Sequence, residues 1–274
     1  MLRSAMKRVH DLTALRDTLA KEMPFSIQAL ESVKHQTTFK LEPAKPCYVS
    51  EDEKSSLVVI KEASSDACPM YTIYCNQPDV AKVERDLKDF INWNEPWGFG
   101  GVPSYLAPTL KKMALANGPE EHLEIMDCWV FILDPDVVLP EVEIPSKYKI
   151  QQVPPCDAKY MDDLWKYKSG PSLDLLVAQT KVGLGFGAYA DGELASSTAV
   201  FNFGALGGTG TAEKHRRNGL SQMIHVFASK HLRSLGLIPF GFVESYNIPS
   251  RKMMEKLKFS QTHDGAWLFW KRPK

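Results

Sequence analysis

The segment from Thr211 to Met223 constrains this chain most, because it joins a strand-like stretch to an amphipathic helix through a basic turn. Small residues fill the stretch before the turn, and the turn reads Arg216-x-x-Gly219-x-Ser221. The first amides of a helix have no intrahelical partner, and the helix dipole adds positive potential there. Such a turn can hold a diphosphate, with arginine side chains adding charge-assisted hydrogen bonds and Gly219 allowing close approach.

Taken alone, this motif is weak, because short arginine and glycine turns before helices are common and often only solvated. The elements that follow it strengthen the interpretation. A helix is predicted over about 220–235 and ends at Gly236, and an apolar run at 237–243 predicts a buried strand. A second short helix is predicted from Asn247, and an aromatic strand follows at 266–270.

This order of elements resembles the second half of the GNAT acyltransferase fold, whose hallmark is Arg/Gln-x-x-Gly-x-Gly/Ala. Ser221 keeps a small residue at the last position but adds a hydroxyl. The later helix of that fold usually reads Asn-x-x-Ala-x-x-Leu-Tyr-x-x-x-Gly-Phe. Four positions match in place, namely Asn247, Ser250, Met253 and Phe259. Met254 stands where tyrosine is usual, and Lys258 stands where glycine is usual.

A closer resemblance, covering nearly the whole length, is to the glycine N-acyltransferase-like branch of that superfamily. The C-terminal residues in the family's spacing are Gly192-Glu193, Gly204, Gly210-Thr211, Arg216, Gly219, Leu235-Gly236 and Asn247. The N-terminal residues that resemble it are Tyr71-Thr72-Ile73-Tyr74 and Ile91-Asn92-Trp93. The resemblance implies an α/β fold of the α+β type. A smaller α/β domain would precede a C-terminal GNAT domain whose mixed central sheet is splayed at its fourth and fifth strands.

The region 134–155 holds five prolines among alternating acids and aliphatics, so part of it is predicted to be a linker. We therefore expect an α/β domain at 1–138 and a GNAT domain at 139–274. Strand and helix alternate in both halves, so the N-terminal half could be a degenerate copy of the other. It holds no Arg-x-x-Gly-x-small turn, and we assign it no acyl-CoA site.

Hydrophobic periodicity places further elements. In the N-terminal half, helices are predicted at 10–22, 80–93 and 106–116, and strands at 57–62, 70–75 and 122–133. The segment 93–103 is rich in Trp, Gly and Pro and is predicted to be a loop. In the C-terminal half, a strand is predicted at 148–153, a helix at 156–165, and a hairpin of 185–191 and 193–203 around the turn Asp191-Gly192.

The resemblance implies that the donor is coenzyme A, as acetyl-CoA or a longer acyl-CoA, and that no metal takes part. The residues assigned to CoA are Leu206, Thr209, Thr211, Arg216, Arg217, Asn218, Gly219, Leu220, Ser221 and Asn247. The turn would hold the diphosphate, and the edge of the strand at 206–211 would pair with the pantetheine arm. Gly207, Gly208 and Gly210 would allow a bulge, whose backbone N–H groups could meet the oxyanion. Asn247 would face the arm or cap the following helix.

The proton-transfer residues that are usual in the resembled family are absent here. The family's usual glutamate position is Ala205 here, and its usual tyrosine is Met254. Glu244, which ends the strand predicted near 240–243, is the first choice for a catalytic residue. Tyr246, two residues later in the sequence, is the second candidate. The alternatives are that Glu244 pairs with a surface cation and that water carries the proton.

The leading prediction is an acyl-CoA-dependent N-acyltransferase that acts on a small amine or an amino acid such as glycine. One alternative is a catalytically weak or silent acyl-CoA-binding protein. Ala205 and Met254 favour it. Another is an arylalkylamine or polyamine acetyltransferase. A polyamine site would use clustered acids, and Asp162-Asp163 and Glu120-Glu121 are the candidates.

The amino-acid composition narrows the classes of partner and of protein that remain. The 274 residues include 33 Lys and Arg and 33 Asp and Glu, so the formal net charge is zero. This balance argues against a nucleic-acid or anionic-membrane partner, and no apolar run is long enough to span a bilayer. Five scattered cysteines without a C-x-x-C pair favour reduced thiols in an intracellular protein, cytoplasmic or mitochondrial, over a disulfide scaffold or zinc site. We expect a monomer or a weak homodimer.

Overall fold

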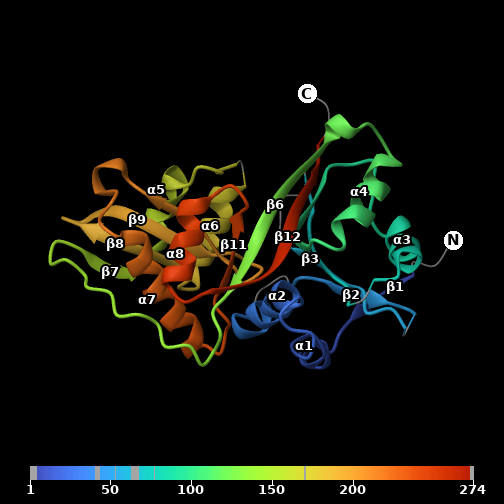
Figure 1. Cartoon of the computed structure of the whole chain (residues 1–274), viewed down its shortest axis with the longest axis horizontal. Coiled ribbons are helices and arrows are strands. Elements are labelled where there is room, and N and C mark those ends of the chain that lie inside the picture. Colours follow the sequence, from blue (N-terminus) through green and yellow to red (C-terminus); the bar gives the residue numbers. More distant parts are fainter. Residues whose placement is uncertain are drawn as a thin grey trace. The chain divides into compact units, whose positions relative to one another are not determined.

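The computed structural model describes residues 5–40, 44–52, 54–62, 68–76, 78–169 and 171–271 (Figure 1). Contacts divide the chain into two compact units. The N-terminal unit consists of Met1–Val130, Val243–Tyr246 and Thr262–Lys274, and the C-terminal unit consists of Phe131–Phe242 and Asn247–Gln261. The last strand therefore groups with N-terminal residues, whereas the predicted division at residue 138 places it in the C-terminal domain.

The N-terminal unit holds a mixed sheet with helices. Its strands follow the order β1-β2-β3-β4-β5-β12-β6. The strands are β1 (Met6–Val9), β2 (Cys47–Ser50), β3 (Val58–Glu62), β4 (Met70–Tyr74), β5 (Trp97–Pro103), β12 (Ser260–Trp270) and β6 (Leu123–Ile132). The helices are α1 (Leu12–Ala20), α2 (Ile27–Thr38), α3 (Val80–Lys88) and α4 (Ala107–Leu115). Strands β4 and β5 run parallel, and the other registered neighbours, β1 to β4 and β5 with β12, run antiparallel.

The loop predicted at 93–103 is wrong, because this segment contains β5, all of whose residues are buried. Two glycines explain the error. A Cβ on Gly98 would lie 2.3 Å from the sulfur of Met70, and a Cβ on Gly100 would lie 2.8 Å from the ring of Trp267. Glycine here admits large neighbours against a buried strand rather than ending it.

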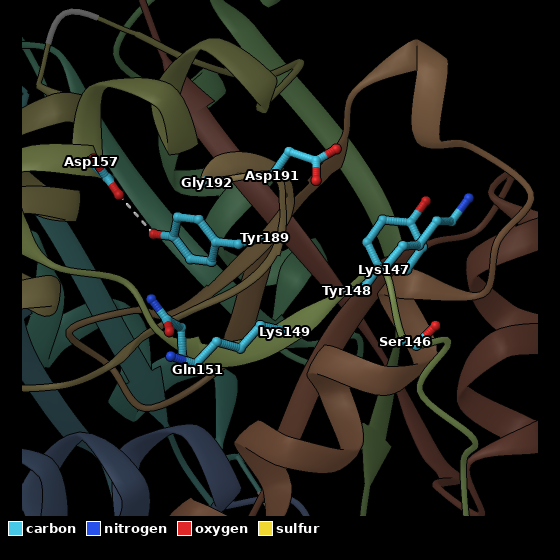
Figure 2. Close-up of a pocket in the computed structure, with 9 residues that line it drawn as sticks. All are labelled: Ser146, Lys147, Tyr148, Lys149, Gln151, Asp157, Tyr189, Asp191 and Gly192. Atoms are coloured by element: carbon cyan, nitrogen blue, oxygen red, sulfur yellow. Dashed lines mark hydrogen bonds between the residues drawn. The ribbon is translucent and has the colours of Figure 1, made fainter.

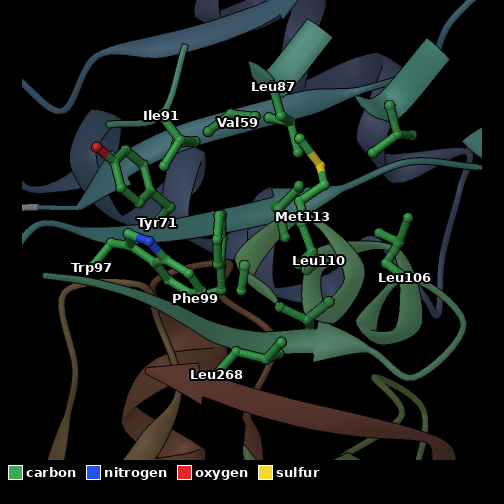
Figure 3. Packing of buried hydrophobic residues seen from close by; sticks show 14 of the residues in the cluster. Val59, Tyr71, Leu87, Ile91, Trp97, Phe99, Leu106, Leu110, Met113 and Leu268 are labelled. Atoms are coloured by element: carbon green, nitrogen blue, oxygen red, sulfur yellow. The ribbon is translucent and has the colours of Figure 1, made fainter. Parts of the chain in front are cut away.

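Aromatic and aliphatic side chains from β5, its neighbours and two helices form the core of this unit (Figure 3). Trp97 and Phe99 of β5 contact each other at 5.0 Å between ring centroids. Leu87 of α3 and Leu110 of α4 are fully buried in the same cluster. Burial of this apolar surface is the main stabilising term for the unit.

Helix α2 buries polar side chains as well as apolar ones. Lys45 Nζ donates to Glu62 Oε2 at 3.0 Å and to Ser32 Oγ at 2.6 Å. Ser32 Oγ donates to Glu62 Oε1 at 2.8 Å, and Thr72 Oγ1 donates to the same oxygen at 2.7 Å. Because these groups are almost fully buried, each depends on its partners to offset the loss of water.

The C-terminal unit holds the strands in the order β11-β10-β9-β8-β7. The strands are β7 (Lys149–Gln152), β8 (Gly185–Ala190), β9 (Glu193–Val200), β10 (Leu206–Thr211) and β11 (Phe240–Glu244). The helices are α5 (Ala158–Leu164), α6 (Ser172–Lys181), α7 (Leu220–Ser234) and α8 (Ile248–Lys256). Strands β7 to β10 pair antiparallel, and β10 pairs parallel with β11, so the predicted mixed sheet is confirmed.

Turn residues place these elements as the sequence predicts. Asp191 and Gly192 both have positive φ, 51° and 83°, as the two central residues of a type I′ hairpin require. Gly236, with φ of 72°, follows the end of α7. Within the described part of the chain, no helix is both long and apolar enough for a membrane span.

Candidate functional site

Strand β10 carries a bulge at the glycines that the sequence marks. Gly207 lies opposite Ala199 of β9, but Gly210 lies opposite Ser197, so β10 holds one more residue than β9 over this stretch. Gly208 has φ of 64°, a conformation that costs glycine little. The predicted bulge is confirmed. A bulge leaves one residue out of the ladder and turns its backbone groups away from the neighbouring strand.

Strands β10 and β11 part soon after they begin. Their parallel ladder registers one pair among the described residues, Leu206 with Gly241. Beyond that pair β10 stays with β9, where Thr211 lies opposite Ser196. These are the fourth and fifth strands of the unit along the chain, so the predicted splay lies where the sequence places it.

Hydroxyl groups connect β10 to its neighbours. Thr209 Oγ1 lies 2.9 Å from Thr198 Oγ1, and Thr211 Oγ1 lies 2.8 Å from Ser196 Oγ. Thr211 Oγ1 also lies 3.3 Å from Ser221 Oγ in the first turn of α7. These contacts tie the strand to the start of the helix.

The turn between β10 and α7 has an uncommon backbone. Arg216 is extended, whereas Arg217 has φ of 65° and Gly219 has φ of 74°. A left-handed arginine costs about 1–2 kcal/mol relative to its ordinary conformations. Asn218 holds the turn, because its Nδ2 donates to the carbonyl oxygens of His215 at 3.0 Å and Arg216 at 3.1 Å.

The N–H groups of residues 217–221 have no hydrogen-bond partner within the described residues. The helical bonds begin one residue later, where the N–H groups of Gln222 and Met223 donate to the Gly219 oxygen at 3.0 and 3.2 Å. Gly219 is the N-cap of α7, and no side chain caps the helix. Donors left in this way, with alternating backbone conformations, form an anion-binding concavity.

The basic side chains of the turn differ in their surroundings. Lys214 forms a salt bridge with Glu193 at 2.6 Å, and His215 Nδ1 lies 3.1 Å from the hydroxyl of Tyr148. Arg216 and Arg217 are exposed and form no ion pair in the described part of the chain. Arg216 Nε donates only a long bond, 3.4 Å, to the Thr211 oxygen. Both guanidinium groups are available to an anion.

The other predicted CoA residue, Asn247, is the N-cap of α8. Its Oδ1 accepts from the Ser250 N–H at 3.2 Å, which is the capping role considered from the sequence. A contact of Asn247 with a pantetheine arm stays a prediction.

Glu244 and Tyr246, the predicted catalytic residues, group with the N-terminal unit. Glu244 is half-buried, and Tyr246 is 66% exposed. Burial raises the pKa of the Cys128 thiol to about 12, and the charges of Asp127, Glu244 and Asp264 add to this rise. Glu244 therefore lies in an acidic part of that unit. Its assignment as the base stays a prediction.

The two positions where the resembled family carries proton-transfer groups are apolar and buried. Ala205 is 1% exposed, and Met254 is 3% exposed. Neither side chain can accept or donate a proton. Because both positions are buried, a water molecule could take the place of either side chain only if a cavity opened there.

The C-terminal unit also contains an open hollow of about 480 Å³, shown in Figure 2. Its lining residues are Ser146, Lys147, Tyr148, Lys149, Gln151, Asp157, Tyr189, Asp191 and Gly192. Tyr189 donates its hydroxyl to Asp157 Oδ2 at 2.8 Å, and burial, aided by this bond, raises the pKa of Tyr189. None of the sequence-predicted CoA residues lines this hollow, so we do not assign the site to it.

One group of residues beside the bulge has no counterpart in the sequence prediction. The ring of Phe201 occupies the space where a side chain on Gly207 would lie, with 2.4 Å between Phe201 Cε2 and the position of a Cβ. The signal available in the sequence was the Phe201-Asn202-Phe203 loop directly before the glycine-rich strand.

Comparisons with known proteins agree with this architecture. Residues 182–268 match the family model described as FR47-like protein. A protein from Drosophila is similar in structure, with a TM-score of 0.83 at 18% identity, over 97% of this chain and 98% of that one. A GCN5-related N-acetyltransferase from Kribbella flavida has a TM-score of 0.59 at 15% identity, over 90% of this chain and 96% of that one.

A tandem GNAT protein from the clavulanic acid biosynthesis pathway has a TM-score of 0.52 at 15% identity, over 98% of this chain and 99% of that one. The search of curated proteins found no match. At these identities the structural likenesses show the fold. The C-terminal unit has the GNAT fold, and the two-unit arrangement is consistent with a tandem GNAT protein.

Proposed function

We propose that this protein is an acyl-CoA-dependent N-acyltransferase that moves an acyl group from the CoA thioester to a small amine or an amino acid such as glycine. The observation that carries the proposal is the run of N–H groups at 217–221 that have no partner among the described residues, flanked by two arginines without an ion pair there, directly after a bulged and splayed strand. The GNAT fold and the structural similarity to a GCN5-related N-acetyltransferase from Kribbella flavida support acyl transfer.

The donor would lie along β10. Its diphosphate would accept from the N–H groups of Gly219, Leu220 and Ser221, with Arg216 and Arg217 beside it. The amides of its pantetheine arm would pair with the edge of β10 that β11 leaves open between Leu206 and Thr211. The thioester oxygen would then reach the N–H groups of the bulge.

The chemistry is aminolysis of a thioester. The amine nitrogen attacks the carbonyl carbon, the C–N bond forms, and the oxygen carries the negative charge until the C–S bond breaks. The amine loses one proton to a base, for which we propose Glu244, and the departing thiolate takes one, for which we propose Tyr246. A neutral amine needs less help from the base than an ammonium does.

A second candidate is a catalytically silent acyl-CoA-binding protein. The buried Ala205 and Met254 favour it, because the proton-transfer positions of the resembled family are apolar here. The polyamine alternative has less support. Asp163 forms salt bridges with Lys159 and Lys168, and the buried Asp162 accepts from Ser172, so these acids are engaged within the unit.

Calorimetry with CoA tests the donor site. We expect one CoA per chain, since only the C-terminal unit has the turn, and Arg216→Ala should weaken binding by about 1.5–3 kcal/mol. Lys230→Ala, on the exposed surface of α7, is the control. Unchanged affinity in Arg216→Ala, or two CoA per chain, would contradict the assignment.

Mass spectrometry of products from a panel of acyl-CoAs and amines tests the reaction. N-acylated product whose formation depends on the amine supports the transferase, whereas CoA release that does not depend on the amine supports the silent alternative.

We also propose an intracellular monomer or weak homodimer, cytoplasmic or mitochondrial, in keeping with the balanced charge and the free cysteines.

A further inference from the structure

The N-terminal unit holds a half-buried carboxylate, Glu22, in the segment between α1 and α2. Its Oε2 accepts a hydrogen bond from the Tyr74 hydroxyl at 3.3 Å and another from the side-chain amide of Asn76. Both donors are uncharged. Within the described residues, Glu22 forms no ion pair and its Oε1 has no hydrogen-bond partner. The negative charge is therefore held by neutral groups, and one carboxylate oxygen can still accept.

Three rings of the same unit lie in contact with one another. The Phe25 ring centroid lies 5.8 Å from that of Tyr105 and 4.9 Å from that of His263, and the ring planes are inclined by 66° and 47°. Phe25 is 43% exposed and Tyr105 is 38% exposed. Exposed rings that contact one another form a contiguous apolar surface, which single scattered side chains do not. Such a surface is stabilised when a ligand covers it.

A chain of contacts connects the carboxylate to these rings. The Tyr105 hydroxyl donates to the Cys75 carbonyl oxygen at 3.0 Å, and the next residue, Asn76, donates to Glu22. Burial raises the pKa of the Tyr105 hydroxyl to about 12, and the charges of Cys75 and Glu22 add to this rise. The charge of Glu22 thus acts on a member of the ring cluster. We call this surface the Glu22 site, and its members are Glu22, Phe25, Tyr105 and His263.

The Glu22 site is held in place by its own hydrogen bonds. The Asn76 N–H donates to Ser56 Oγ at 2.7 Å, and Ser56 Oγ donates to the Asn76 oxygen at 2.8 Å. His263 Nδ1 lies 3.0 Å from Thr262 Oγ1. Burial lowers the pKa of His263 to about 4, so its ring is uncharged at neutral pH and does not neutralise Glu22. Groups that are positioned before a ligand arrives reduce the entropy cost of binding.

We propose that the Glu22 site binds a small organic ammonium ion that carries an apolar or aromatic body. The Oε1 atom of Glu22 accepts from the ammonium N–H groups, and the body lies on the exposed rings of Phe25 and Tyr105. Ring faces attract a cation as well, so the same ligand satisfies both parts of the site. A metal cation would leave the rings uncovered, and an anion would be repelled by Glu22. This inference concerns binding to the unit without the arginine turn, and it does not rest on the proposed function.

Calorimetry of the full chain without acyl-CoA tests the site with 2-phenylethylammonium and with 2-phenylethanol, which has the same body but no charge. We expect the ammonium to bind at least about tenfold more tightly than the alcohol. Glu22→Gln should bring the two ligands within about twofold of each other, and Phe25→Ala should weaken binding of the ammonium by about fivefold. Glu51→Gln, at an exposed glutamate of the same unit, is the matched control and should preserve the preference.

Three results would overturn the inference. The first is that the ammonium does not bind, or binds no more tightly than the alcohol, because the charge of Glu22 would then play no part. The second is an ammonium affinity that survives Glu22→Gln but is lost in Glu244→Gln, which would place the cation at Glu244. The third is an unchanged affinity in Phe25→Ala, which keeps the test decisive if Glu22→Gln does not fold. No CoA is present in these measurements, so this inference and the proposed function can fail independently.

Discussion

Leu206 of β10 and Gly241 of β11 pair in the parallel ladder, and a Cβ at position 241 would lie 3.0 Å from the Leu206 carbonyl oxygen. The backbone at the apex of the splay is therefore as close as glycine permits. This contact fixes where the two strands begin to part.

Gly241→Ala should lower the free energy of unfolding by about 1–3 kcal/mol, because the neighbour in the way is backbone and cannot rotate aside. Urea unfolding followed by circular dichroism measures this loss, with Lys230→Ala as the surface control. A stability equal to wild type would show that the apex has room to spread.

Arg217→Gly should change stability and binding in opposite directions. Removing the left-handed arginine relieves backbone strain, so the free energy of unfolding should rise by up to about 1 kcal/mol. Removing the cation should weaken CoA binding by about tenfold. Arg217→Lys keeps both the strain and the charge, so it should leave stability unchanged and weaken CoA binding less. A CoA affinity that survives Arg217→Gly would place the diphosphate elsewhere.

Glu244→Gln tests the proposed base. The amide keeps the shape of the side chain but cannot accept a proton, so turnover should fall by about 10²–10⁴-fold while CoA still binds. The low-pH limb of the rate profile should also disappear. Glu255→Gln, on the surface of α8, is the control. Wild-type turnover with an unchanged pH profile would make Glu244 structural and leave the proton to water.

His225 should make the protein less stable in mild acid. Burial lowers the pKa of this side chain to about 4 from an ordinary value of 6.5, and its ring lies 2.7 Å from the Ser221 oxygen through Nδ1. Because the unfolded chain binds the proton more tightly, the stability from neutral His225 is full above pH 6.5 and is lost as the pH falls towards 4. The loss approaches about 3 kcal/mol at the lower limit.

His225→Asn keeps a donor for the Ser221 oxygen but does not titrate in this range. Its free energy of unfolding should therefore fall less steeply between pH 6.5 and 4 than that of wild type. His263, whose pKa burial also lowers to about 4, remains in the variant and accounts for the slope that persists. Equal slopes in the two proteins would mean that His225 is not the group being titrated.

The sequence predicted the turns, the bulge and the helix end, because each depends on a few residues that are close together in the chain. The Asp191-Gly192 hairpin, the bulge at Gly208 and the end of α7 at Gly236 each need a positive φ, and glycine marks that need in the sequence. The turn at 216–221 belongs to the same class, because a helix start and its unpaired amides follow from a short stretch of chain.

The elements that the sequence did not predict depend on contacts between residues far apart in the chain. Strand β5 looks like a loop because Gly98 and Gly100 are needed for Met70 and Trp267, which lie far away in the sequence. Helix α2 was not predicted from the hydrophobic pattern, because its buried face mixes apolar residues with polar ones such as Ser32, which is satisfied by Lys45 and Glu62. No periodicity can indicate a partner on another element.

The bulge in β10 makes the number of residues in this strand matter as much as their identity. Five residue steps from Leu206 to Thr211 run beside four steps of β9, from Val200 to Ser196. Deleting one residue at the bulge would leave four steps beside four, so Thr211 would stay opposite Ser196, but the bulge and the backbone groups that it turns out of the ladder would be lost. Substitutions can therefore preserve the bulge, whereas an in-frame loss of one codon removes it.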